Sequence, residues 1–228
     1  MLSAAQKDAF NRDGYLIIND VIDTALLDRI KAEYAARMND IYTAWFGAGR
    51  VSAPPETLDF WQQLAAARAA GLEWYQPRDI SLPHADITDD TPFHFGPSVF
   101  DLLTNTRVLD IAESVIGSEL TSNPIQHVRI KPPQAEVDPD EVRAHIVATA
   151  WHQDRGVGLA EADETEILTV WIAMTDATSE NGCLRVIPTP PDRMLPHCPK
   201  AQTAIADAFV EEDRAIDADH NQSNPLNL

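Results

Sequence analysis

Residues 145–154 read His-Ile-Val-Ala-Thr-Ala-Trp-His-Gln-Asp, an apolar run followed by a His-x-Asp pair. The apolar run predicts a β-strand, and residues i and i+2 of a strand point to the same side. His152 and Asp154 would therefore present an imidazole nitrogen and a carboxylate oxygen to one point. These are two of the three ligands in a 2-His-1-carboxylate triad, which holds Fe(II) and leaves positions open. The stretch thus predicts a strand that carries two metal ligands.

This short motif needs support from its surroundings, because His-x-Asp matches also arise by chance. A second match, His84 to Asp86, lies in the Pro- and Asp-rich stretch SLPHADITDDTPFHFGP. That composition predicts a loop, so we interpret the second pair as solvated or capping. The evidence for His152 and Asp154 has to come from the rest of the chain.

Four blocks of sequence, taken in order, resemble the phytanoyl-CoA dioxygenase family from about residue 8 to about residue 199. The blocks are residues 10–18 (FNRDGYLII), 126–133 (QHVRIKPP), 151–154 (WHQD), and 168–176 with 181–188 (LTVWIAMTD and NGCLRVIP). The resemblance implies a mainly β fold with flanking helices, namely a double-stranded β-helix (a cupin-like jelly roll). It also implies an oxygenase that depends on Fe(II) and 2-oxoglutarate.

The activity implied by the resemblance is hydroxylation of a small organic substrate at an unactivated C–H bond. O2 is consumed, and 2-oxoglutarate is decarboxylated to succinate. Fe(II) would be held by His152 and Asp154, and no acid–base catalytic residue is required. The sequence does not identify the substrate.

The family's second iron-binding histidine and its 2-oxoglutarate-binding arginine have no clear match in this chain. His197 follows a Pro-rich segment that predicts a surface loop, His220 lies in a polar tail, and the last arginine is Arg214. A jelly roll needs about eight strands. Five candidates are found: residues 15–18, 125–131, 145–150, 167–176 and 183–188. We therefore expect one domain over residues 1–228 that resembles the N-terminal two-thirds of the family and lacks the last barrel strands.

Two alternative hypotheses follow from the missing ligands. The chain could be a truncated, non-catalytic remnant or a binding module with an incomplete iron site. It could also keep the jelly roll and use a metal for non-oxidative, cupin-like chemistry, because one fold supports many functions.

Basic side chains near the second block are candidates for cosubstrate binding. His127, Arg129 and Lys131 share one face of the expected strand, and buried cations there are costly unless they meet anions. The resemblance places Lys131 beside 2-oxoglutarate, and His127 faces the same way on the expected strand. A solvated face is the alternative, favoured for Arg129. The resemblance also places Gln153 near the cosubstrate, although a regular strand would point it away. Trp171 either packs in the core or walls the 2-oxoglutarate pocket.

Composition limits the partners. The formal net charge of −19 argues against binding nucleic acid or an anionic membrane surface, which need a basic footprint. The chain shows no leader segment and no apolar run long enough to span a bilayer, so we expect a cytoplasmic protein. Its oligomeric state cannot be read from the sequence.

Local patterns predict helices over residues 3–11, from Asp23 onward, over residues 60–70 and over residues 99–116. Ser3 and Asp23 are expected N-caps, and Gly117 is expected to end the last helix. The buried face of the second helix is predicted from apolar residues at helical spacing, namely Leu26, Leu27, Ile30 and Tyr34. Asn181-Gly182 predicts a tight turn.

Overall fold

The structure of the chain is a computed structural model that describes residues 1–72, 88–89, 94, 96–123, 127–131, 137, 151–154, 164–192 and 216–217. Two compact units are distinguished. The first comprises Met1–Val21, Thr106–Leu120 and Ile130–Leu228, and the second Ile22–Asn105 and Thr121–Arg129. Among the described helices, none has a stretch long and apolar enough to cross a membrane.

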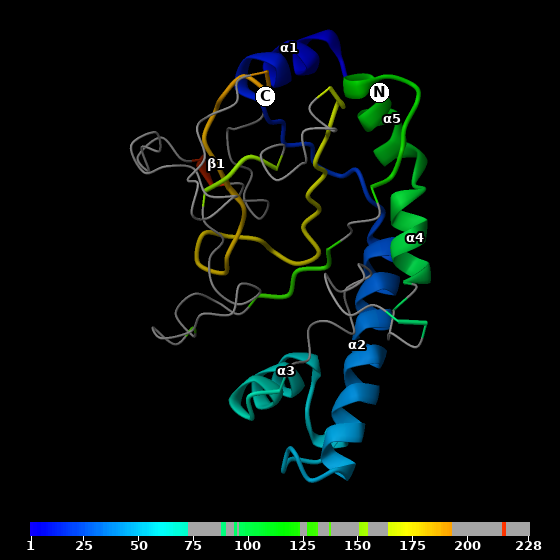
Figure 1. The fold of residues 1–228 in the computed structure, drawn as a ribbon, viewed down its shortest axis with the longest axis vertical. Helices are drawn as coiled ribbons and strands as arrows, with labels where there is room; N and C mark the ends of the chain where they lie inside the picture. The colour runs from blue at the N-terminus through cyan, green and yellow to red at the C-terminus, as the bar shows by residue number, and fades with distance from the viewer. Residues whose placement is uncertain are drawn as a thin grey trace. The chain divides into compact units, whose positions relative to one another are not determined.

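The second unit is organised around α2 (Thr24–Gly47), the long blue helix of Figure 1. Asp23 is its N-cap residue, as predicted, but the Asp23 side chain makes no capping hydrogen bond. Leu26, Ile30 and Tyr34 are buried, which confirms the predicted apolar face, and Leu27 is half-buried. In proteins, most of the stability of a helix comes from packing of its apolar face. The buried face of α2 therefore explains why the helix forms here.

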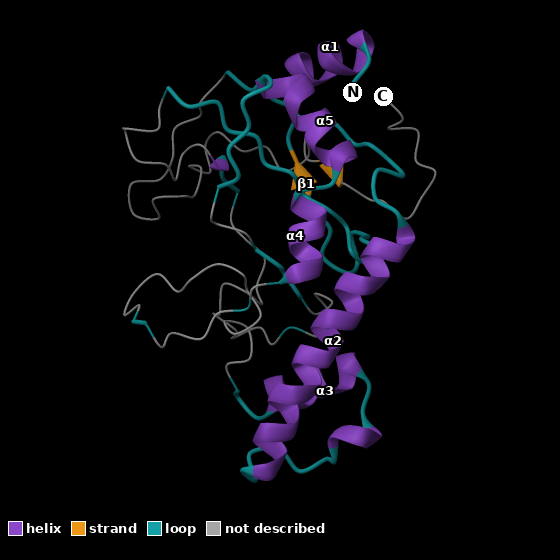
Figure 2. Ribbon diagram, turned by 90° about the vertical axis from the view of Figure 1, so that its right-hand side faces the viewer, coloured by secondary structure: helices purple, strands orange, loops and turns teal. Residues whose placement is uncertain are grey.

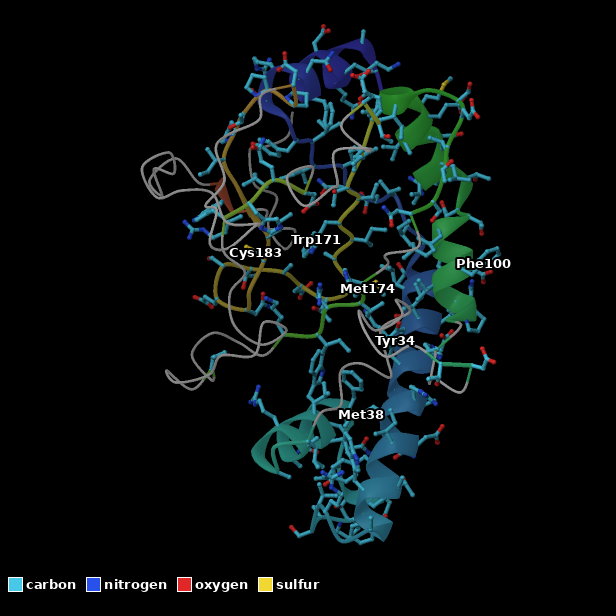
Figure 3. The ribbon with its side chains drawn as sticks, in the orientation of Figure 1. Tyr34, Met38, Phe100, Trp171, Met174 and Cys183 are labelled. Atoms are coloured by element: carbon cyan, nitrogen blue, oxygen red, sulfur yellow. The ribbon has the colours of Figure 1, made fainter. Side chains whose placement is uncertain are left out.

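The helices α3 (Phe60–Ala69) and α4 (Pro97–Leu103) and the short 3-10 helix η1 (Pro55–Thr57) all contact α2. In α3, Asp59 and Gln62 form a reciprocal capping box. The centre of this unit is fully buried, with no exposed surface at Met38, Tyr42 or Ala67. Figure 3 labels Tyr34 and Met38 along α2, together with Phe100 on α4.

The first unit contains the helices α1 (Ala4–Asp13) and α5 (Thr106–Ile116). Ser3 caps α1 with a capping box, as predicted. The start of the chain is tied to α5 because the backbone N–H of Leu2 donates to Ser114 Oγ at 3.1 Å. The Arg107 guanidinium, at the start of α5, donates to the backbone carbonyl of Asp20. Gly117, which follows α5 with φ 93°, ends this helix as expected.

The described strands are β1 (Arg185–Val186) and β2 (Ile216–Asp217), which pair antiparallel with Arg185 opposite Asp217 (Figure 2, orange). β1 lies within one expected strand, residues 183–188. Three other candidates differ from the prediction: residues 15–18, 127–131 and 167–176 are not strands in the structure. A strand needs a hydrogen-bonded neighbour. Residues 145–150, the strand predicted to lead into His152 and Asp154, lie outside the described residues. The jelly roll therefore stays a prediction.

Candidate metal centre

His152 and Asp154 meet at one point in the first unit. His152 Nε2 lies 3.1 Å from Asp154 Oδ1. The two side chains are 30% and 48% exposed, so solvent reaches them. They converge as the i, i+2 spacing predicts, although residues 151–154 form no assigned strand.

The second oxygen of Asp154 has a different partner. Thr169 Oγ1 donates a hydrogen bond to Asp154 Oδ2 at 2.5 Å. Sequence reasoning missed Thr169, which stands alone as a polar residue in the apolar run Ile167–Trp171. A signal was present, because Thr169 and Trp171 are i, i+2 neighbours and Trp171 was already a candidate for the site.

Asp154 is ionised at neutral pH. The hydrogen bond from His152 lowers the pKa of Asp154 most, partial burial raises it, and the hydrogen bond from Thr169 lowers it again. The net pKa lies below the ordinary value. Asp154 therefore offers a carboxylate, the form in which an aspartate binds a metal.

The distance between the two donor atoms fits a shared metal ion. A divalent first-row metal binds imidazole nitrogen and carboxylate oxygen at about 2.1 Å. Two such ligands at a right angle lie about 3 Å apart, close to the 3.1 Å between His152 Nε2 and Asp154 Oδ1. The donor set, one imidazole and one carboxylate, suits Fe(II).

A third ligand is not found in the part of the chain that the structure describes, where no group of three His, Cys, Asp or Glu residues could hold a metal ion. His197, His220 and Arg214, the late candidates from the sequence, lie outside the described residues. So does the second His-x-Asp pair, His84 to Asp86.

The structure also describes the residues predicted to lie near 2-oxoglutarate. Lys131 and Gln153 are half-buried in the first unit, and Trp171 is 39% exposed there. Figure 3 labels Trp171 and Met174 along one yellow segment of the chain. His127 and Arg129 are exposed and belong to the second unit. The roles of these residues in cosubstrate binding stay predictions.

Segments around the pair are tied together by side-chain contacts. The Arg185 guanidinium of β1 lies over the ring of Trp151, 5.5 Å from its centroid, a cation–π contact. The predicted turn at Asn181 is confirmed: its side chain accepts from Thr178 N at 2.6 Å and donates to the Asp176 carbonyl at 2.5 Å. The contact between Arg185 and Trp151 connects the third and fourth blocks of the sequence, and the Asn181 hydrogen bonds hold the turn within the fourth.

The first and fourth blocks also touch. The backbone N–H of Thr189 donates to the carbonyl of Asp13 at 2.9 Å. Beside it, the α carbon of Gly14 lies so close to the Thr189 carbonyl oxygen that a Cβ would overlap it. Thr189, which follows the fourth block directly, thus contacts the first block.

Comparison with known proteins identifies the family of the chain. The family model described as phytanoyl-CoA dioxygenase (PhyH) matches residues 10–190, most of the 228-residue chain. A search of curated proteins and a search of solved structures found no match. The matched range includes His152, Asp154 and Thr169 as well as all four blocks of sequence. The chain therefore belongs to the phytanoyl-CoA dioxygenase family.

Proposed function

We propose that this chain is an Fe(II)- and 2-oxoglutarate-dependent dioxygenase that hydroxylates a small organic substrate at an unactivated C–H bond. Enzymes of its family normally use Fe(II), 2-oxoglutarate and O2 and act on small molecules. The observation that carries the proposal is the convergence of His152 Nε2 and Asp154 Oδ1 at 3.1 Å.

In this proposal His152 and Asp154 hold the metal, the first through its neutral imidazole and the second through its carboxylate. When bound, Fe(II) with 2-oxoglutarate and O2 supplies the oxidising power, and the cosubstrate is converted to succinate and CO2. The protein's contribution is to hold the ligands and position the substrate. His127, Lys131, Gln153 and Trp171 are proposed to bind 2-oxoglutarate, and the proposed fold is a single jelly-roll domain with flanking helices.

The test is succinate formation from 2-oxoglutarate, measured in air with Fe(II) and a pool of small organic metabolites. We expect His152→Ala and Asp154→Ala each to lower succinate formation at least about 100-fold, because each removes a metal ligand. Asp40→Ala removes an exposed aspartate of α2 and serves as the matched control. It should keep the wild-type rate.

Other results would select an alternative function. Wild-type rates in both ligand variants would show that the metal site is assigned to the wrong residues. Metal binding by the wild-type chain with no response to 2-oxoglutarate would favour non-oxidative, cupin-like chemistry. A wild-type chain that binds neither would favour the binding module or remnant.

A further inference from the structure

We propose that Thr169 is a positioning residue that decides which oxygen of Asp154 faces the metal. The inference rests on the proposed function, since it needs His152 and Asp154 to be metal ligands. It adds a residue that the His-x-Asp motif does not contain and that comes from a different segment of the chain.

The two oxygens of the Asp154 carboxylate are divided between two partners. Oδ2 accepts the hydrogen bond from Thr169 Oγ1 at 2.5 Å, and Oδ1 lies 3.1 Å from His152 Nε2. An ionised carboxylate only accepts hydrogen bonds, so Thr169 must be the donor. This hydrogen bond holds Oδ2 away from His152. Oδ1 is therefore the carboxylate oxygen that faces the same metal position as the imidazole nitrogen.

This division has a consequence for the metal. A carboxylate that can turn freely binds a divalent ion through one oxygen or through both. With Oδ2 engaged by Thr169, Asp154 is restricted to binding through Oδ1. One-oxygen binding keeps a coordination position open, which a site of this class needs for its cosubstrate and O2.

Thr169 has the chemistry for this task. Hydrogen bonds from a hydroxyl to a carboxylate are short and about twice as strong as neutral ones, in agreement with the 2.5 Å distance. The β-branched side chain of threonine is stiff at χ1, so the donor keeps its direction. Thr169 is itself exposed, which means that core packing does not account for the contact.

A purely structural hydrogen bond would behave differently. Removing it would alter the stability of the fold and leave metal affinity unchanged. A positioning role requires the opposite pattern, because hydrogen-bond partners of metal ligands typically change metal affinity by about 10–100-fold when they are mutated.

The experiment is an anaerobic titration with Mn(II), followed by the electron paramagnetic resonance signal of the free ion. We expect Thr169→Val to weaken Mn(II) binding about tenfold, and Thr169→Ser, which keeps the hydroxyl, to bind like the wild type. Thr165→Val makes the same substitution at another exposed threonine and should change nothing. The ligand-field spectrum of bound Co(II) should change in Thr169→Val alone, because its carboxylate is free to bind through both oxygens.

Two results for the variants, and one for the wild-type chain, would overturn the inference. Wild-type Mn(II) affinity in Thr169→Val would show that the hydrogen bond has no positioning role. Equal weakening in Thr169→Ser, which keeps the hydroxyl, and Thr169→Val, which lacks it, would show that the effect does not come from the hydroxyl hydrogen bond. If Thr169→Val does not fold by circular dichroism, Thr169→Ala removes the same hydroxyl with less bulk and decides in its place. A wild-type chain that binds no Mn(II) would overturn the proposed function as well, which separates the two failures.

Discussion

Gly14 stands where two segments of the first unit approach most closely. It follows α1 with φ 75°, in the left-handed region that side chains other than glycine rarely adopt. A Cβ at this position would overlap the carbonyl oxygen of Thr189, whose own N–H donates to Asp13. Both the backbone conformation and the lack of space therefore require glycine here.

We predict that Gly14→Ala lowers the free energy of unfolding by at least about 1–3 kcal/mol, the usual cost of a left-handed non-glycine residue. The overlap with Thr189 adds to this cost, because backbone has to move. The measurement is the midpoint of urea unfolding. Gly47→Ala is the control, since Gly47 has no neighbouring atom within 4 Å of a new Cβ and no positive φ. Equal midpoints for the two variants would contradict this account.

The placement of single residues could be predicted where the sequence pattern involves close neighbours in the chain. The convergence of His152 and Asp154 was predicted from their i, i+2 spacing, and the two side chains do meet, although residues 151–154 are not a strand. Thr169 was missed, because its one signal in the sequence is the i, i+2 spacing from Trp171, while its partner Asp154 lies 15 residues earlier. In the same way, the sequence does not reveal the contact of Gly14 with Thr189.

At the level of elements, one carboxylate fastens the start of α4 to α2. Glu33 Oε2 accepts from the backbone N–H of Ser98 at 2.9 Å, and Glu33 Oε1 lies 2.7 Å from His94 Nε2. Both the Glu33 and His94 side chains are only 15% exposed. The edge of the His94 ring also packs against Tyr34. Because α4 has only seven residues, these contacts are an important part of what holds it in place.

The stability of the second unit should depend on pH through Glu33. Burial raises the pKa of Glu33, but hydrogen bonds from Ser98 and His94 outweigh it, so the net pKa lies below the ordinary 4.5. A carboxyl with a lowered folded pKa stabilises the fold above its unfolded pKa, and this contribution is lost as the pH falls through the folded pKa. We predict that Glu33→Gln makes the unfolding free energy flatter than in the wild type between about pH 3 and pH 6.

The measurement is urea unfolding at a series of pH values. Near neutral pH, Glu33→Gln should also be less stable by about 1 kcal/mol, because it loses charge-assisted hydrogen bonds. Glu113→Gln, at an exposed position of α5, is the control and should keep the wild-type pH profile. If both variants follow the wild-type curve, the Glu33 contacts do not stabilise α4.

Helices were predicted well because their signals lie within a few residues. Ser3 caps α1, the apolar positions of α2 are buried, and α3 covers residues 60–69. Strands depend on partners far along the chain, so residues 15–18 and 167–176 have strand-like sequences without being strands in the structure. The turn at Asn181 depends only on neighbouring residues, and this prediction is confirmed.

At the scale of the whole molecule, the net charge of −19 affects the binding of the anionic cosubstrate. The surrounding field repels a dianion such as 2-oxoglutarate unless a local positive charge offsets it. A divalent ion, if held by His152 and Asp154, would supply positive charge for the cosubstrate. Binding of 2-oxoglutarate should therefore depend on the metal.

The most direct test is anaerobic equilibrium dialysis of 2-oxoglutarate against the full chain, with and without Mn(II) in place of Fe(II). We predict that about one equivalent binds with the metal, and that binding weakens at least about tenfold without it or in His152→Ala. The same 2-oxoglutarate affinity in all three samples, or no binding in any, would contradict a metal centre built on His152 and Asp154.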